Sequence, residues 1–153
     1  GKAKDIVKLA IANNGITAFN KDKSKFTEVA YMANEISFYK LDGDTPRKDS
    51  NYCIKSLNFD LVDGRINSKE TIGYLSATYS KDNIFALYCG VPESKGIATY
   101  GKQVQVFDLD GQLQQKLILD KAAFQISVNE DGTKLFVLYH EPEPCIAEYD
   151  LDR

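Results

Sequence analysis

Hydrophobic residues occur along this chain in short runs that are separated by turns rich in Asn, Asp, Gly and Lys. Runs rich in Val, Ile, Phe and Tyr with such borders are typical of β-strands. Three segments, at residues 36–42, 104–110 and 146–152, share an apolar first position, an aromatic fourth position and a final Leu-Asp. Because the same ending returns three times, the sequence predicts three copies of one structural unit.

Each copy is expected to contain a first strand, a tight turn, a second strand, a connection and a third strand that carries the shared ending. The first strands are expected at residues 16–19, 75–79 and 124–128, and the second strands at residues 26–31, 84–89 and 135–139. Asp110-Gly111 and Asp131-Gly132 are typical of tight hairpin turns, since Gly adopts positive φ without strain. Asp110-Gly111 leads to a fourth strand at residues 113–119. In the first copy, Asp42-Gly43 is expected to open a longer loop before a strand at residues 52–57.

The second strands indicate how the copies pack. Residues 84–88 and 135–139 are apolar on both faces, and a strand of that kind must be covered on both sides. Stacked four-stranded blades provide this cover, because each blade lies between two neighbours. The sequence therefore predicts an all-β protein of about three four-stranded antiparallel blades, half of a β-propeller, in one domain at residues 1–153.

The blades are expected at about residues 16–58, 71–120 and 122–153. The third copy lacks a fourth strand, and residues 5–11 alternate in a way that could supply it. Substantial helix content would contradict this interpretation.

Three stretches, at residues 72–88, 104–111 and 124–139, resemble the C-terminal blades of TolB-like six-bladed β-propellers, a family of bacterial, often Bacteroidetes, secreted or lipid-anchored proteins. The likeness covers residues 71–153 well and residues 1–70 as a looser blade. It implies half of a six-bladed ring and an extracytoplasmic location, in the periplasm or at the cell surface, with an anchor on a removed N-terminal segment. It implies no catalytic residue.

Charge and hydropathy exclude two classes of partner. The chain has 19 Lys and Arg against 22 Asp and Glu, for a net charge of −3, and the two signs are interleaved. Nucleic-acid binding needs a clustered basic surface, so no nucleic-acid partner is expected. No apolar run approaches the length of a membrane span.

The three cysteines, Cys53, Cys89 and Cys145, are far apart and form no CxxC pair. This spacing argues against a disulfide framework and against a zinc site. Each lies beside strand-like sequence, so all three are expected to be unbonded and buried.

Catalytic patterns are absent from the sequence. A metal site around the only histidine, His140, would use Glu141 or Glu143 and Cys145, but the prolines between them suit no familiar ligand geometry. No GxSxG motif supplies a nucleophilic serine. No cofactor is expected.

The acidic pairs 108/110 and 150/152 recur at equivalent positions of the copies. This recurrence favours a structural role in turns, where Asp accepts backbone hydrogen bonds, over a catalytic pair of carboxylates.

The antiparallel strand order places the long connections at residues 58–71 and 90–101, and the loop at His140, on one edge of the blades. Binding residues concentrate on loops that a rigid scaffold holds. The candidate binding residues are therefore Glu93, Lys95 and Tyr100 in the 90–101 insertion, together with His140. An insertion without a function fits the sequence equally well.

Two classes of function remain open. The first is a non-enzymatic extracytoplasmic binding or scaffolding module with a protein or carbohydrate ligand. The alternative is a propeller-type hydrolase or lyase that acts on extracellular sugars or peptides.

Three blades cannot close a ring, so a homodimer or the missing half of a longer chain is expected to complete it. In a homodimer, Leu135, Val137, Phe85 and Leu87, or residues beside them, would contact the other chain.

Overall fold

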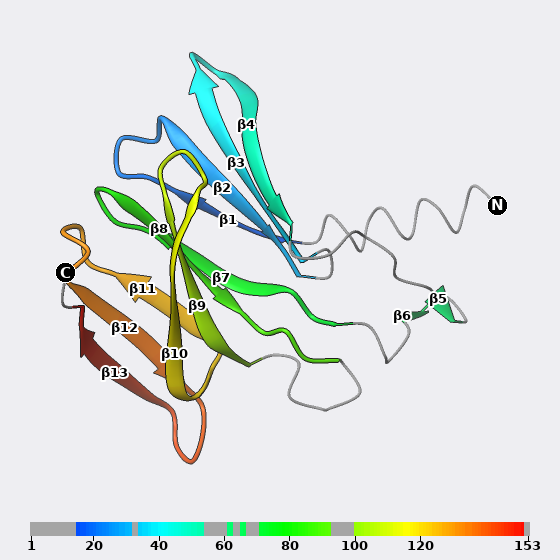
Figure 1. Cartoon of the computed structure of the whole chain (residues 1–153), viewed down its shortest axis with the longest axis vertical. Helices are drawn as coiled ribbons and strands as arrows, with labels where there is room; N and C mark the ends of the chain where they lie inside the picture. Colours follow the sequence, from blue (N-terminus) through cyan, green and yellow to red (C-terminus); the bar gives the residue numbers. More distant parts are fainter. Residues whose placement is uncertain are drawn as a thin grey trace.

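A computed structural model describes residues 15–31, 34–53, 61–62, 65–66, 71–92 and 100–151. In this part of the chain the secondary structure is entirely β-strand and turn, with no helix (Figure 1). Accordingly, none of these residues belongs to a helix long and apolar enough to cross a membrane. The predicted dominance of strands is confirmed.

The strands form three antiparallel sheets and a small hairpin. The first sheet has the order β1-β2-β3-β4, the second β10-β9-β8-β7 and the third β11-β12-β13. The bounds of the first sheet are β1 (Gly15–Phe19), β2 (Lys25–Ala30), β3 (Glu35–Asp42) and β4 (Thr45–Cys53). Those of the second are β7 (Tyr74–Tyr79), β8 (Asn83–Tyr88), β9 (Gly101–Asp108) and β10 (Leu113–Ala123). Those of the third are β11 (Gln125–Val128), β12 (Lys134–Tyr139) and β13 (Cys145–Asp150), and the hairpin pairs β5 (Leu61–Val62) with β6 (Arg65–Ile66).

The three sheets stack against one another so that their first strands, β1, β7 and β11, are neighbours (Figure 1). Each of these strands lies at one edge of its own sheet. This arrangement is that of consecutive propeller blades with their first strands nearest the axis. It confirms the predicted fold class, with three strands in the described part of the third blade.

A hydrophobic core lies between each pair of neighbouring sheets. The core between the first and second sheets is lined by Val29, Ile36, Phe38, Tyr74, Ile84, Ala86 and Phe107. The core between the second and third sheets is larger and mainly aliphatic, and includes Leu75, Phe85, Leu87, Val104, Val106, Leu119, Ile126, Val128, Leu135 and Val137. The second sheet thus buries both of its faces, as the apolar pattern of residues 84–88 predicts.

The turns follow the expected chemistry. Gly111 and Gly132 adopt φ values of +86° and +69°, which confirms the two predicted hairpin turns. Asp108 accepts hydrogen bonds from the backbone N–H groups of Asp110 and Gln112 at 3.0 and 2.9 Å. The structural role predicted for this acidic pair is therefore confirmed at Asp108.

The expected long loop after Asp42-Gly43 is wrong. Gly43, at φ +62°, lies in a two-residue turn, and β4 begins directly at Thr45. Residues 45–51 are polar and solvent-exposed or half-buried, so no hydrophobic alternation marks the strand in the sequence. Pro46 fits there because β4 is an edge strand, where a missing N–H costs no ladder hydrogen bond.

The cysteine prediction is wrong in part. Cys89 is free and half-buried, and burial raises the pKa of its thiol, whereas Cys145 is free and exposed. Cys145 begins β13, the outer strand of a sheet in which no described fourth strand covers it. The side chain of Cys53 and the predicted closing strand at residues 5–11 lie outside the described residues.

The side chains named for a homodimer contact also need correction. Leu135, Val137, Phe85 and Leu87 are all buried inside the chain, in the core between the second and third sheets. They cannot meet a second chain, because a neighbouring sheet of the same chain already covers them.

Candidate functional site

The three first strands line a groove of about 600 Å³. Its walls are residues 16–19 of β1, residues 75–79 of β7 and residues 124–127 at the start of β11. The lining combines apolar side chains with hydroxyl and amide groups and contains no Asp, Glu, Lys, Arg or His. The groove therefore offers contact area and uncharged hydrogen-bonding groups.

The position of the groove follows from the strand order. Because β1, β7 and β11 are edge strands, each pairs within its own sheet on one side only. Between β7 and β11 the gap is bridged by Ser76, whose Oγ lies 3.4 Å from both the backbone N and the backbone O of Ile126. On β1, Ile16 and Phe19 remain about half exposed.

An aromatic cluster adjoins the groove at the start of β11. The Phe124 ring, which lines the groove, meets the His140 ring edge-on with a centroid distance of 5.9 Å. The centroid of the Tyr100 ring lies 6.4 Å from that of the His140 ring. The structure thus brings together Tyr100 and His140, two of the four candidate residues, while Glu93 and Lys95 lie outside the described residues.

At its other end the groove continues into a second hollow of about 540 Å³, which shares Phe19 and Tyr79 with it. The turns that follow the three first strands surround this hollow. Lys21 Nζ binds the Glu130 carboxylate at 2.6 Å, and the backbone N–H of Lys81 donates to Glu130 O at 2.7 Å. The charged groups thus lie at the end of the groove and not along it.

Tyr79 is the ionisable residue that lines the groove. Burial raises its pKa to about 12, and its hydroxyl lies 2.6 Å from Thr27 Oγ1. The phenol is consequently neutral at physiological pH. General acid–base catalysis favours a group with a pKa near the working pH, and Tyr79 does not meet that condition.

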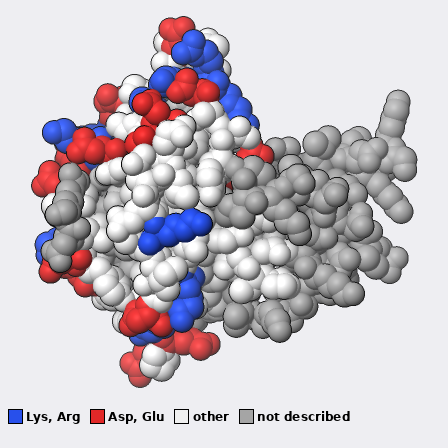
Figure 2. Space-filling view, viewed as in Figure 1, with Lys and Arg blue, Asp and Glu red and all other residues white. Residues whose placement is uncertain are grey.

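Metal-ligating side chains do not gather in the described ranges. Among those residues no group of three or more His, Cys, Asp or Glu is placed to hold a metal ion. Figure 2 shows Lys and Arg interspersed with Asp and Glu at the top, left and bottom of one face, with basic side chains also on the otherwise uncharged area between them.

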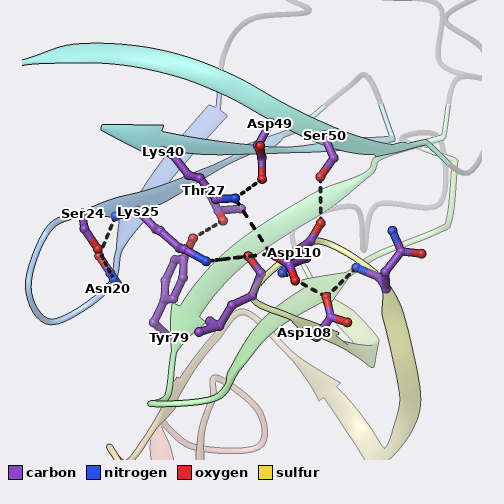
Figure 3. A network of polar contacts seen from close by, with 12 residues as sticks. Asn20, Ser24, Lys25, Thr27, Lys40, Asp49, Ser50, Tyr79, Asp108 and Asp110 are labelled. Atoms are coloured by element: carbon purple, nitrogen blue, oxygen red, sulfur yellow. Dashed lines mark hydrogen bonds and ion pairs between the residues drawn. The ribbon is translucent and has the colours of Figure 1, made fainter. Parts of the chain in front are cut away.

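A polar network lies beside the groove, between the first and second sheets. Figure 3 shows Lys25 and Lys40 of the first sheet directed toward Asp110 in the turn between β9 and β10. Their Nζ atoms lie 4.0 and 3.9 Å from Asp110 Oδ1. Ser50 Oγ donates to the backbone O of Asp110 at 3.0 Å. These contacts lie between the first and second sheets and involve none of the residues that line the groove.

Sequence reasoning missed the groove because it placed function on loops. A signal was nevertheless present, since Thr17, Thr78, Gln125 and Ser127 interrupt the apolar residues of the first strands. A polar residue that recurs in the innermost strand of each copy indicates a wall that faces a ligand or solvent and not a core.

The fold and the groove together define a segment of a β-propeller. A family model described as TolB-like 6-blade propeller-like matches residues 5–131, most of the chain. The chain therefore belongs to the TolB-like family of six-bladed propellers. A search of curated proteins finds no match.

Solved structures with a similar fold come from functionally unrelated proteins. A Bacteroides fragilis protein provisionally assigned as a 6-phosphogluconolactonase gives a TM-score of 0.60 at 10% identity, covering 92% of this chain and 36% of that one. The β-propeller domain of Cps50 (Swd1) from Myceliophteria thermophila gives a TM-score of 0.58 at 10% identity, covering 90% of this chain and 40% of that one. Kuenenia stuttgartiensis hydrazine synthase gives a TM-score of 0.58 at 12% identity, covering 88% of this chain and 31% of that one. The chain thus spans well under half of each, and at these identities the likeness concerns the fold alone.

Proposed function

We propose that this protein is a non-enzymatic binding module whose ligand lies in the groove along β1, β7 and β11. The observation that carries the proposal is the lining, in which strands of all three blades contribute apolar, hydroxyl and amide groups but no charged side chain. Such a surface suits a neutral, elongated ligand, because a charged ligand would lose hydration without gaining a partner.

A neutral sugar chain fits this surface best. Sugar rings stack on aromatic faces, which Tyr100, Phe124 and His140 supply beside the groove. Sugar hydroxyls pair with groups such as Thr17 and Gln125, both exposed in the groove. The module would hold the sugar chain along the length of the groove, with sugar rings stacked on the aromatic cluster.

An extracytoplasmic location is part of this proposal. Support comes from membership of the TolB-like family, since the family resemblance implies secreted or lipid-anchored proteins.

Titration of the protein with neutral oligosaccharides, followed by calorimetry, tests the proposal. Anionic oligosaccharides of the same length and neutral peptides serve as comparison ligands. We expect neutral sugars to bind and anionic sugars to bind at least tenfold more weakly. Binding of peptides alone would keep the groove as a site and refute the sugar; binding of none of the three would refute the module.

Matched variants locate the site. Thr17→Val removes one groove hydroxyl without changing the shape of the side chain, and Thr45→Val makes the same change on exposed β4, outside the groove. We expect Thr17→Val and His140→Ala each to weaken binding several-fold and Thr45→Val to leave it unchanged. Equal affinities for all three variants would place the ligand elsewhere.

A further inference from the structure

We infer that the hollow at the end of the groove binds a small zwitterion with an aromatic or large apolar body, such as an aromatic α-amino acid. The hollow has a volume of about 540 Å³ and is lined by residues 19–22, residues 79–81 and Glu130. Sites for small molecules usually have volumes of about 300–1,000 Å³, so the hollow is large enough. The inference is independent of the sugar proposed for the groove, because it rests on charged side chains that the groove lacks.

The hollow is built from the same turn of each sheet. Figure 1 shows the turns that follow β1, β7 and β11 on one side of the molecule, at the left. Lys21, Lys81 and Glu130 hold the same place in these turns, each two residues after the end of its strand. All three residues line the hollow. The repeat thus gathers one charged residue from every sheet around a single space.

One pair of these charges is complete. Lys21 Nζ binds both carboxylate oxygens of Glu130, at 2.6 and 2.7 Å, and so joins the turn of the first sheet to that of the third. The backbone N–H of Lys81 donates to the backbone O of Glu130 at 2.7 Å, which joins the second turn to the third. The three turns therefore hold one another at the rim of the hollow.

Two opposite charges in the hollow remain without a counterion. Lys81 is exposed, and its ammonium group has no acceptor among the residues that the structure describes. Asp22 accepts hydrogen bonds from Asn20 Nδ2, Ser24 N and Ser24 Oγ, all on Oδ1, and its Oδ2 has no donor in the same part of the chain. These donors are neutral, and the Ser24 hydroxyl has the largest effect in lowering the pKa of Asp22, so the carboxylate is charged at neutral pH.

A zwitterion is the ligand that satisfies both groups. No ion pair joins Lys81 to Asp22 in the described structure, although both residues line the hollow. A carboxylate on the ligand would pair with Lys81 and an ammonium group with Asp22, whereas a ligand with one charge would leave one of them unpaired. Phe19, which is 52% exposed, and Tyr79 supply aromatic surface for an apolar body.

Three compounds with the same aromatic body test the inference. Phenylalanine carries both charges, phenylpropionate lacks the ammonium group and phenethylamine lacks the carboxylate. NMR titration of the isotope-labelled chain measures their affinities, with the backbone N–H signals of Ser24 and Lys81 as reporters in the hollow. We expect phenylalanine to bind with a Kd of about 1 mM. The other two should bind about fivefold more weakly, since each loses one exposed ion pair. Equal affinities of the three compounds, or no shift of either signal with phenylalanine, would overturn the inference.

Matched variants assign each charge of the ligand to its partner. Lys81→Gln should weaken phenylalanine and phenylpropionate about fivefold and leave phenethylamine unchanged. Asp22→Asn keeps the Oδ1 acceptor of the turn, and should weaken phenylalanine and phenethylamine but not phenylpropionate. Lys116→Gln is the control, because Lys116 is exposed on β10 and does not line the hollow. Equal effects of Lys81→Gln on all three compounds would contradict the assignment.

Thr17→Val separates the hollow from the groove. Thr17 lines the groove but not the hollow, so its substitution should leave the affinity for phenylalanine unchanged. If Thr17→Val weakens phenylalanine as much as Lys81→Gln does, the compound binds along the groove and the inference is wrong. Failure of neutral sugars to bind would leave the phenylalanine result as it stands, since the two ligands are titrated separately.

Discussion

The two contacts between neighbouring sheets are built from different side chains. Between the first and second sheets, the Phe107 ring meets Phe38 at 5.4 Å and Tyr52 at 5.2 Å between centroids. The hydroxyls of Thr27 and Tyr79 pair beside these rings at 2.6 Å. This contact is aromatic and carries polar groups within it.

Between the second and third sheets, the core is mainly aliphatic. Its polar contacts are those of Ser76 with the backbone of Ile126, at 3.4 Å, and a group of hydroxyls around Asp120. There Asp120 of β10 accepts hydrogen bonds from the hydroxyls of Tyr139 and Tyr149 at 3.2 and 2.7 Å. These hydrogen bonds hold the pKa of the Asp120 carboxyl below its usual value, and the bond from Tyr149 has the larger effect.

The same repeat therefore stabilises its two inter-sheet contacts in different ways. Aliphatic packing depends on filled volume, so the second contact should respond most to cavities. A buried hydroxyl pair depends on both partners, so the first contact should respond to the loss of single oxygen atoms.

The largest effect is expected from a cavity in the aliphatic core. Leu87 is fully buried there, so Leu87→Ala should lower the free energy of unfolding by about 2–5 kcal/mol. Urea denaturation measures the loss, and hydrogen exchange should locate it in the second and third sheets. Exposed Ile118→Ala is the control and should change stability by about 0.5 kcal/mol or less. A comparably small effect of Leu87→Ala would contradict the importance of this core.

A smaller effect is expected from the hydroxyl pair of the aromatic contact. Tyr79→Phe leaves the fully buried Thr27 hydroxyl without its partner, which should cost about 1–2 kcal/mol. Thr27→Val should cost a similar amount. The double variant should cost less than the sum of the two, since both single changes break one hydrogen bond. Strict additivity would show that the two hydroxyls do not interact.

Alkaline pH should weaken the same contact. Burial raises the pKa of Tyr79 to about 12 in the folded protein, against an ordinary value of 10.0. A raised pKa contributes stability that is fully present below pH 10 and is lost as the pH rises toward 12. For this residue the loss at pH 11 should be about 1 kcal/mol. Urea denaturation at pH 9 and pH 11 measures it, and Tyr79→Phe should show a correspondingly smaller difference between the two.

The sequence predicts the blades because their signals are local and repeated. The shared ending that opens at Ile36, Val104 and Ile146 marks the third strand of every sheet, and Gly111 and Gly132 mark two hairpin turns. The first part of β4, which was expected to be a loop before a strand at residues 52–57, escaped prediction, since an exposed edge strand needs no hydrophobic alternation.

The site is less predictable for a different reason. Tyr100 and His140 could be assigned to one edge from the strand order, but their proximity depends on how the second and third sheets pack. The burial of Phe85 and the exposure of Cys145 depend on which sheet lies beside each strand. Those facts belong to the arrangement of the blades, which no single repeat encodes.

The smallest effect is expected at the exposed margin of the aromatic contact. Asp110 lies 4.0 and 3.9 Å from the Nζ atoms of Lys25 and Lys40, but its side chain is 75% exposed. Ion pairs of this kind contribute little, so Asp110→Asn should cost about 0.5 kcal/mol or less, and the cost should vanish in 1 M salt, where the screening length is about 3 Å. The turn itself should survive the substitution. Asp108 still caps it, and Ser50 still donates to the backbone O of residue 110, which the substitution keeps.

Asp108→Ala is the informative comparison. It removes two hydrogen bonds to backbone N–H groups and should cost about 1 kcal/mol with no dependence on salt. Thermal denaturation at low and high salt distinguishes the two variants. A large loss for Asp110→Asn that persists in high salt would show that the carboxylate holds the first two sheets together directly, and that the aromatic contact depends on charge as well as on its buried hydroxyl pair.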